Sequence, residues 1–107
     1  MSSEWIKACT VNDVSEEEPF CAEMSDGTKV AVYKVGDEYF STDDLCTHGN
    51  ASLSEGWQEG DEIGCPFHGG SFHIRTGEPV KYPCVKPLRT YPVKVHGGDI
   101  FIEYPDE

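Results

Sequence analysis

Two stretches decide how this chain folds: Leu45-Cys46-Thr47-His48-Gly49 and Gly64-Cys65-Pro66-Phe67-His68-Gly69-Gly70. We call them the first arm and the second arm. Each arm pairs one thiol with one imidazole, as Cys-x-His in the first and Cys-x-x-His in the second. Together the arms offer four soft or borderline ligands and no carboxylate, a set that favours zinc or an iron–sulfur cluster.

The near-equivalence of the arms favours two irons over a single zinc. In a mixed-ligand [2Fe–2S] centre, Cys46 and Cys65 would bind one iron while His48 and His68 bind the other. Two thiolates in place of four leave the oxidised centre neutral, so it accepts an electron more easily, on the histidine-bound iron. The alternative is a structural Cys2His2 zinc module, which predicts a colourless protein. The common zinc pattern keeps both cysteines in one arm, whereas here they are separated.

Glycines flank both arms, at Gly49, Gly64, Gly69 and Gly70. A loop that wraps a metal needs unusual backbone dihedrals and close backbone approach, and glycine allows both. Gly64 has an ordinary turn as an equally good explanation.

The charge of the chain excludes one class of partner and suggests another. The 107 residues, enough for one domain, carry a formal net charge of −12, and nucleic acid is a poor partner for such a surface. No Lys or Arg occurs from Val35 to Ile74, a window that contains both arms. Its acidic side chains could simply form a solvated face, but together they would steer basic partners toward the metal site. They are Asp37, Glu38, Asp43, Asp44, Glu55, Glu59, Asp61 and Glu62.

Nothing in the chain indicates a membrane span or a signal peptide, because no apolar run is long enough and the N-terminus lacks a basic region. We therefore expect a cytoplasmic protein. Cys9, Cys21 and Cys84 remain outside the arms and are expected to be small, buried, reduced thiols. His73 and His96 are expected to be surface or packed imidazoles.

Alternating apolar residues separated by turn signals predict a series of short strands. The first forty residues are expected to form a meander, and residues 88–96 a single strand with Tyr91, Val93 and Val95 on one face. Residues 79–87 contain three prolines and cannot form a central strand. The only helical turn expected lies at residues 50–53. The predicted strands include residues 5–10, 20–24, 28–35, 38–42, 71–74, 88–96 and 100–104, and residues 62–64 lead into the second arm.

The predicted fold is thus an all-β, single domain of residues 1–107 with about nine or ten short strands. The arms would form two hairpin tips, side by side, in a metal-binding subdomain of about residues 43–86.

Both arms, and loosely the whole chain, resemble the Rieske [2Fe–2S] ferredoxins. The resemblance implies a Rieske-like fold of antiparallel sheets and a cluster bound by Cys46, His48, Cys65 and His68. It also implies that the proline-containing residues 79–87 cover the cluster.

The chain departs from the Rieske proteins of respiratory complexes. Those proteins carry an extra cysteine in each arm, joined as a disulfide, where this chain has Ala51 and Phe67. They also place a Ser and a Tyr hydroxyl on the cluster, where this chain has Gly70 and Phe72. The missing hydroxyls predict a reduction potential near the low end of the Rieske range.

Around Cys65–Gly70 and Lys86-Pro87-Leu88 the chain looks like the ferredoxin components of bacterial aromatic-ring-hydroxylating dioxygenases. The resemblance implies a monomeric electron carrier, not an enzyme, between a flavin-dependent reductase and a terminal oxygenase. A mononuclear oxygenase iron would need two further histidines and a carboxylate from another domain. A nitrite reductase small subunit, a cluster sensor and the zinc module remain as alternatives.

Overall fold

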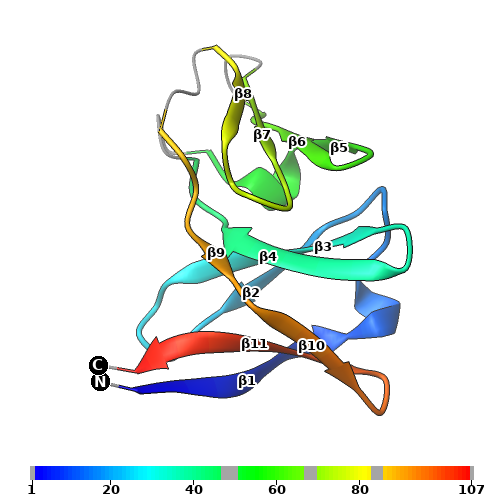
Figure 1. Cartoon of the computed structure of the whole chain (residues 1–107), viewed down its shortest axis with the longest axis vertical. Helices are drawn as coiled ribbons and strands as arrows, with labels where there is room; N and C mark the ends of the chain where they lie inside the picture. Colours follow the sequence, from blue (N-terminus) through cyan, green and yellow to red (C-terminus); the bar gives the residue numbers. More distant parts are fainter. Residues whose placement is uncertain (1, 47–50, 67–69, 83–85, 107) are drawn as a thin grey trace.

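The computed structural model describes residues 2–46, 51–66, 70–82 and 86–106. Within these ranges the chain forms eleven strands in three antiparallel sheets, two short 3-10 helices and no α-helix, which confirms the all-β prediction (Figure 1). The 3-10 helices are η1 (Val11–Asp13) and η2 (Leu53–Glu55). The strands are β1 (Ser2–Thr10), β2 (Phe20–Glu23), β3 (Lys29–Val35), β4 (Glu38–Asp43), β5 (Trp57–Glu59), β6 (Glu62–Gly64), β7 (Ser71–His73), β8 (Pro79–Lys81), β9 (Thr90–Tyr91), β10 (Val93–His96) and β11 (Asp99–Asp106).

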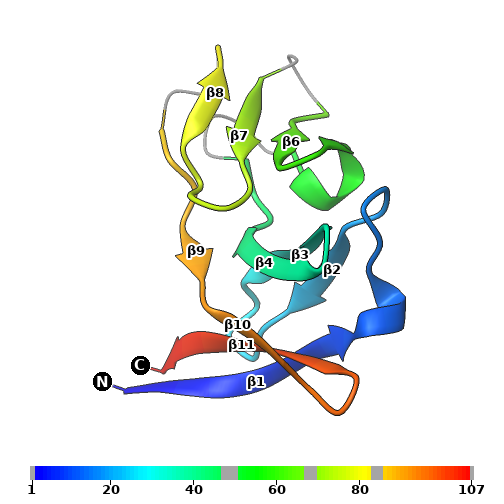
Figure 2. The same ribbon diagram turned by 45° about the vertical axis from the view of Figure 1, so that its right-hand side comes forward.

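The three sheets are stacked along the long axis of the molecule (Figures 1 and 2). The terminal sheet has the order β1-β11-β10, the central sheet β2-β3-β4-β9, and the sheet at the far end β5-β6-β7-β8. We call the last one the arm sheet because it carries the second arm. Its strands position the second arm of the candidate site.

The predicted N-terminal meander is correct for β2, β3 and β4 but wrong for β1. β1 pairs with β11 across the whole length of the chain, in a register that sets Ile6 opposite Ile102. Both residues pack into the core between the terminal and central sheets. Apolar alternation marks β1 as a strand but carries no information about a partner so distant in sequence.

β3 is the centre of the molecule, because it is buried on both faces. All side chains from Val30 to Tyr33 have 0% exposure. Val30 and Val32 pack toward the terminal sheet, while Ala31 and Tyr33 belong to the core beneath the arm sheet. One strand therefore joins the two cores that hold the outer sheets.

The prediction of a single strand at residues 88–96 is wrong. Tyr91 pairs with Ser41 of the central sheet, whereas Val93 pairs with Ile102 of the terminal sheet. Pro92 lies between them, and its ring nitrogen has no proton to continue either ladder. The chain changes sheets at this proline, so Tyr91 is buried while Val95 is 46% exposed.

The arm sheet was predicted only in part. β5 was missed because it lies between two turn signals. The helical turn expected at residues 50–53 corresponds to η2, which lies a few residues later. Asn50 lies outside the described residues. β8 is an edge strand, as its proline requires. Two contacts fix this sheet to the β3–β4 hairpin. Gln58 Nε2 donates to the Lys34 carbonyl at 2.7 Å, and Arg75 Nη1 lies 2.9 Å from Glu38 Oε1.

Candidate metal centre

The second arm extends from a regular hairpin. β6 and β7 pair Ile63 with Phe72 and Gly64 with Ser71, and the next hydrogen bond runs from the Cys65 N–H to the Gly70 carbonyl at 2.7 Å. Cys65 thus stands at the point where the ladder ends and the loop begins. Residues 67–69, which include the predicted ligand His68, lie outside the described residues.

The first arm begins in the same way but with less support. The Cys46 N–H donates to the Ala51 carbonyl at 3.0 Å, five residues later, as Cys65 does to Gly70. Behind it lie an isolated bridge between Leu45 and Ser52 and one backbone hydrogen bond, from the Leu53 N–H to the Asp44 carbonyl. Residues 47–50, which include the predicted ligand His48, lie outside the described residues. The structure therefore places two of the four predicted ligands.

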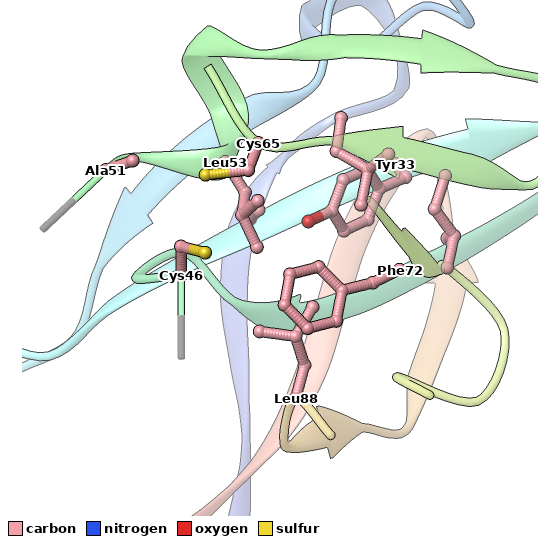
Figure 3. Packing of buried hydrophobic residues seen from close by; sticks show 10 residues of the cluster. Tyr33, Cys46, Ala51, Leu53, Cys65, Phe72 and Leu88 are labelled. Atoms are coloured by element: carbon pink, nitrogen blue, oxygen red, sulfur yellow. The ribbon is translucent and has the colours of Figure 1, made fainter. Parts of the chain in front are cut away.

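Those two cysteines come together. Cys46 and Cys65 are 1% and 0% exposed and belong to the same buried cluster. Figure 3 shows both thiols at one end of that cluster, beside Leu53, with Tyr33, Phe72 and Leu88 toward the other end. Both thiols are therefore shielded from solvent. Among the described residues, no group of three or more His, Cys, Asp or Glu side chains is placed to bind a metal ion. Cys46 and Cys65 are the two predicted ligands that the structure describes.

The surroundings of the thiols fit the thiolate half of a [2Fe–2S] site. Cysteine thiols from two separate arms lie in one buried cluster lined by hydrocarbon, which would keep water from the metal–sulfur bonds of a bound cluster. Ala51, at the position where respiratory Rieske proteins carry a cysteine, is one of the lining residues and is 2% exposed. The other matching position, Phe67, lies outside the described residues.

The need for glycine before the second arm is steric. Gly64 does not have a positive φ, contrary to the prediction of unusual dihedrals, but a Cβ there would lie 2.5 Å from the Trp57 indole. A Cβ at Gly56 would lie 1.9 Å from the Gly64 carbonyl oxygen. Gly56 was therefore missed as a site residue, because the sequence indicated only a turn. Gly49 and Gly69 lie outside the described residues.

Tyr33 is a second residue that sequence reasoning missed. Its side chain is fully buried in the cluster that contains both cysteines, so a phenol is near the site despite the absence of hydroxyls at Gly70 and Phe72. Burial raises the pKa of the Tyr33 phenol well above its ordinary value, so it stays protonated. The phenol oxygen lies 2.8 Å from Thr42 Oγ1, which itself donates to the Asp43 carbonyl at 2.8 Å. Thr42 has one proton, so Tyr33 must be the donor in their bond.

This hydrogen-bond chain leads to a prediction about the reduction potential. Donors to sulfur stabilise the reduced state, and Tyr33 gives its proton to Thr42 instead. We expect Tyr33→Phe to leave the potential unchanged, near the low end of the range of about −150 to +300 mV for Rieske centres. Protein-film voltammetry of both proteins measures this. A wild-type potential well above zero, or a clear fall in Tyr33→Phe, would contradict the prediction.

The remaining predicted features divide between surface and core. Asp44 is only 2% exposed, so it is not part of the acidic surface, whereas Glu55 and Glu59 are exposed. Cys9 is buried as predicted, and burial raises the pKa of its thiol to about 11. Cys21 is exposed, contrary to prediction.

Three smaller points complete the comparison with the sequence. Cys84 lies outside the described residues. His73 is half-buried and His96 exposed, in line with the expectation for both. No helix in the described part of the chain is long and apolar enough to cross a membrane.

Comparison with known proteins places the chain in a family. The model of the Rieske [2Fe-2S] domain matches residues 4–92. Ferredoxin CarAc of Metapseudomonas resinovorans is 42% identical over 102 residues, which cover 95% of each chain. The 3-phenylpropionate/cinnamic acid dioxygenase ferredoxin subunit of Escherichia coli K12 is 46% identical over 102 residues, which cover 94% of each chain.

Solved structures agree with these relatives. The ferredoxin of Sphingomonas yanoikuyae B1 superposes with a TM-score of 0.91 at 45% identity, over 95% of this chain and 100% of that one. A chain from the complex of reduced oxygenase and oxidized ferredoxin in carbazole 1,9a-dioxygenase gives a TM-score of 0.88 at 41% identity, over 96% of this chain and 97% of that one. With two buried thiols meeting from paired arms, and these matches along almost its full length, the chain belongs to the Rieske [2Fe–2S] family.

Proposed function

We propose that this chain is the ferredoxin component of an aromatic-ring-hydroxylating dioxygenase system: a one-electron carrier and not itself an oxygenase. The observation that carries the proposal is the likeness to ferredoxin components of such systems, at 42–46% identity over most of each chain. The buried pair Cys46 and Cys65 supplies the chemistry that such a carrier needs. The bound cluster supplies a one-electron couple, and the chain supplies its ligands and its insulation from water.

The proposed ligands are the four of the two arms. Cys46 and Cys65 bind one iron, and His48 and His68 bind the other. Support comes from the spacing of the arms and from the equivalent positions of the two cysteines at the loop necks. Thiolates favour the ferric state of their own iron, so the histidine side receives the electron. We therefore expect the partners to dock on the histidine side of the cluster.

The proposed partners are a flavin-dependent ferredoxin reductase, as donor, and a terminal ring-hydroxylating oxygenase, as acceptor. The oxygenase–ferredoxin complex of carbazole 1,9a-dioxygenase is a structure of a similar ferredoxin with such an acceptor. One shared docking edge would serve both partners in turn. We further propose a cytoplasmic monomer with a single domain, residues 1–107, whose cluster-binding subdomain spans about residues 43–86.

The alternatives have weaker support. The structure of a putative NADH-dependent nitrite reductase small subunit from Mycobacterium tuberculosis gives a TM-score of 0.82 at 20% identity, which shows a shared fold alone. A structural zinc module disagrees with membership of the [2Fe–2S] family. A cluster sensor shares the family but would transfer no electrons between a reductase and an oxygenase.

Reconstitution with a reductase and an oxygenase tests the proposal. We expect substrate-dependent NADH oxidation to need all three proteins and to saturate with this one. Excess oxidised oxygenase, without substrate, should compete with the reductase for the shared edge and slow reduction of the carrier. Full oxygenase turnover with the reductase alone would refute the carrier role. A loaded cluster that neither partner reduces or oxidises would favour the sensor.

A further inference from the structure

The two arms differ in how their necks are held. The second arm continues the β6–β7 ladder, which belongs to a sheet of four strands. The first arm has one isolated bridge, Leu45 to Ser52, and two backbone hydrogen bonds, Cys46 to Ala51 and Leu53 to Asp44. So short a pairing is marginal in water without further support. Contacts beyond this short pairing are therefore needed to keep the neck of the first arm closed.

Asp44 provides such contacts through its side chain. It precedes the first arm and is 2% exposed. Its Oδ1 accepts the Ser54 N–H at 2.8 Å, and its Oδ2 accepts the Ser52 hydroxyl and, at 3.7 Å, the Cys21 thiol. One carboxylate thus connects the strand entering the arm with the segment leaving it.

The backbone of Asp44 strengthens the same connection. Its carbonyl accepts the Leu53 N–H at 2.7 Å, and its own N–H donates to the Lys29 carbonyl at 3.0 Å. Lys29 begins β3, the strand at the centre of both cores. Asp44 therefore fixes the neck of the first arm to the most buried strand of the protein.

The charge of Asp44 makes these bonds strong. A buried carboxylate is costly unless hydrogen bonds compensate it, and bonds to a charged acceptor are stronger than neutral ones. No ion pair found among the described residues involves Asp44. Donors from Ser52, Ser54 and Cys21 compensate its charge instead, so opening the neck would leave the carboxylate with fewer of them.

We propose that Asp44 is the positioning residue of the first arm: its carboxylate closes the arm's neck, holds Cys46 at its depth and limits the rate of cluster release. This inference rests on the proposed function, because it takes the first arm as a cluster-binding arm. The proposal gives Asp44 a structural role inside the protein. The sequence had instead placed it among the acidic residues expected to attract basic partner proteins.

Two substitutions at Asp44 separate closure of the neck from charge. Asp44→Ala removes every side-chain bond, and we expect iron release to a chelator at least tenfold faster than in the wild-type holoprotein. Tenfold corresponds to about 1.4 kcal/mol, roughly one hydrogen bond to a charged group. Asp44→Asn keeps hydrogen bonds to Ser52 and Ser54 but makes them neutral ones, so its release should be faster than in the wild type and slower than in Asp44→Ala. In this variant the amide Oδ1 can accept a hydrogen bond from the Ser54 N–H, and the amide Nδ2 can donate one to Ser52 Oγ. The Ser52 hydroxyl can then donate its own proton to Ser54 Oγ, which lies 3.1 Å away.

Asp43→Asn is the matched control for charge. Asp43 lies one residue earlier and accepts the Tyr91 hydroxyl at 2.5 Å, away from the neck. We expect wild-type release in this variant. The EPR spectrum of the reduced protein is the second readout: Asp44→Ala should broaden it, because Cys46 would occupy a range of positions, while Asp44→Asn and Asp43→Asn should keep the wild-type line shape.

Each outcome decides the proposal. Wild-type release in Asp44→Ala, or equal acceleration in Asp43→Asn, would overturn it, and so would release in Asp44→Asn that is as fast as in Asp44→Ala. If Asp44→Ala yields no holoprotein, Ser52→Ala decides instead: faster release supports the proposal and unchanged release overturns it. A wild-type protein that binds no cluster would refute the proposed function, and the inference with it.

Discussion

Replacing Cys46 or Cys65 with serine is expected to give a colourless protein without iron or acid-labile sulfide. Both thiols are buried in one hydrocarbon-lined cluster, where a serine hydroxyl would be a harder and weaker ligand. Wild-type protein should contain two irons and two sulfides per chain, with an EPR signal only after reduction. Iron and sulfide analysis, with visible and EPR spectra, measures the difference.

Cys21→Ser is the matched control for these variants. Cys21 is exposed and lies outside both arms, so the control should keep its cluster and colour. A full complement of iron in Cys46→Ser or Cys65→Ser would remove that residue from the ligand set. Stoichiometric zinc and no iron in wild-type protein, produced anaerobically with iron supplied, would contradict the cluster itself.

Gly56→Ala is expected to have the largest effect of any substitution outside the arms. A Cβ at this position would lie 1.9 Å from the Gly64 carbonyl oxygen, and both atoms belong to backbone that no rotamer change can move. β6 must shift, and it leads directly to Cys65. We expect a loss of about 3 kcal/mol in the free energy of unfolding, the upper end for overpacked sites, and a marked loss of bound iron.

Gly60→Ala separates this collision from the general cost of replacing a glycine. Gly60 lies in the same sheet, at the turn between β5 and β6, with φ +61° and open space around its Cβ position. Its substitution should cost about 1–2 kcal/mol, the penalty for a left-handed conformation, and leave cluster content unchanged. Denaturant unfolding and iron analysis of both variants test the comparison. Equal stability and equal iron content would show that β6 can move without consequence.

Short-range features of the fold could be read from the sequence because their causes are local. The spacing of Cys46 with His48 and of Cys65 with His68 is itself the signal of a mixed-ligand centre. Apolar alternation and turn residues located most of the strands, and the proline in β8 correctly excluded it from the middle of a sheet. The family and the carrier role followed from the same arms, and the similar proteins bear them out.

Features that depend on distant partners could not be read in this way. The pairing of β1 with β11 and the change of sheet at Pro92 depend on which strands bury their apolar faces together. Residues 88–96 alternate as one strand would, and periodicity does not identify the partner of either half. β5 was missed because it is only three residues long. So short a segment between two turns shows no clear alternation of apolar and polar residues.

The sequence by itself predicted the metal chemistry of this protein, because the four proposed ligands stand in two short motifs that carry their own spacing. Only the tertiary structure decided what surrounds them. Asp44 looks like one more acidic residue, until the fold buries it and surrounds its carboxylate with the donors of the first arm's neck. Tyr33 looks like a strand residue, until β3 carries it into the core shared by Cys46 and Cys65. Burial and hydrogen bonding arise from segments that meet only on folding, so no local pattern in the chain contains them.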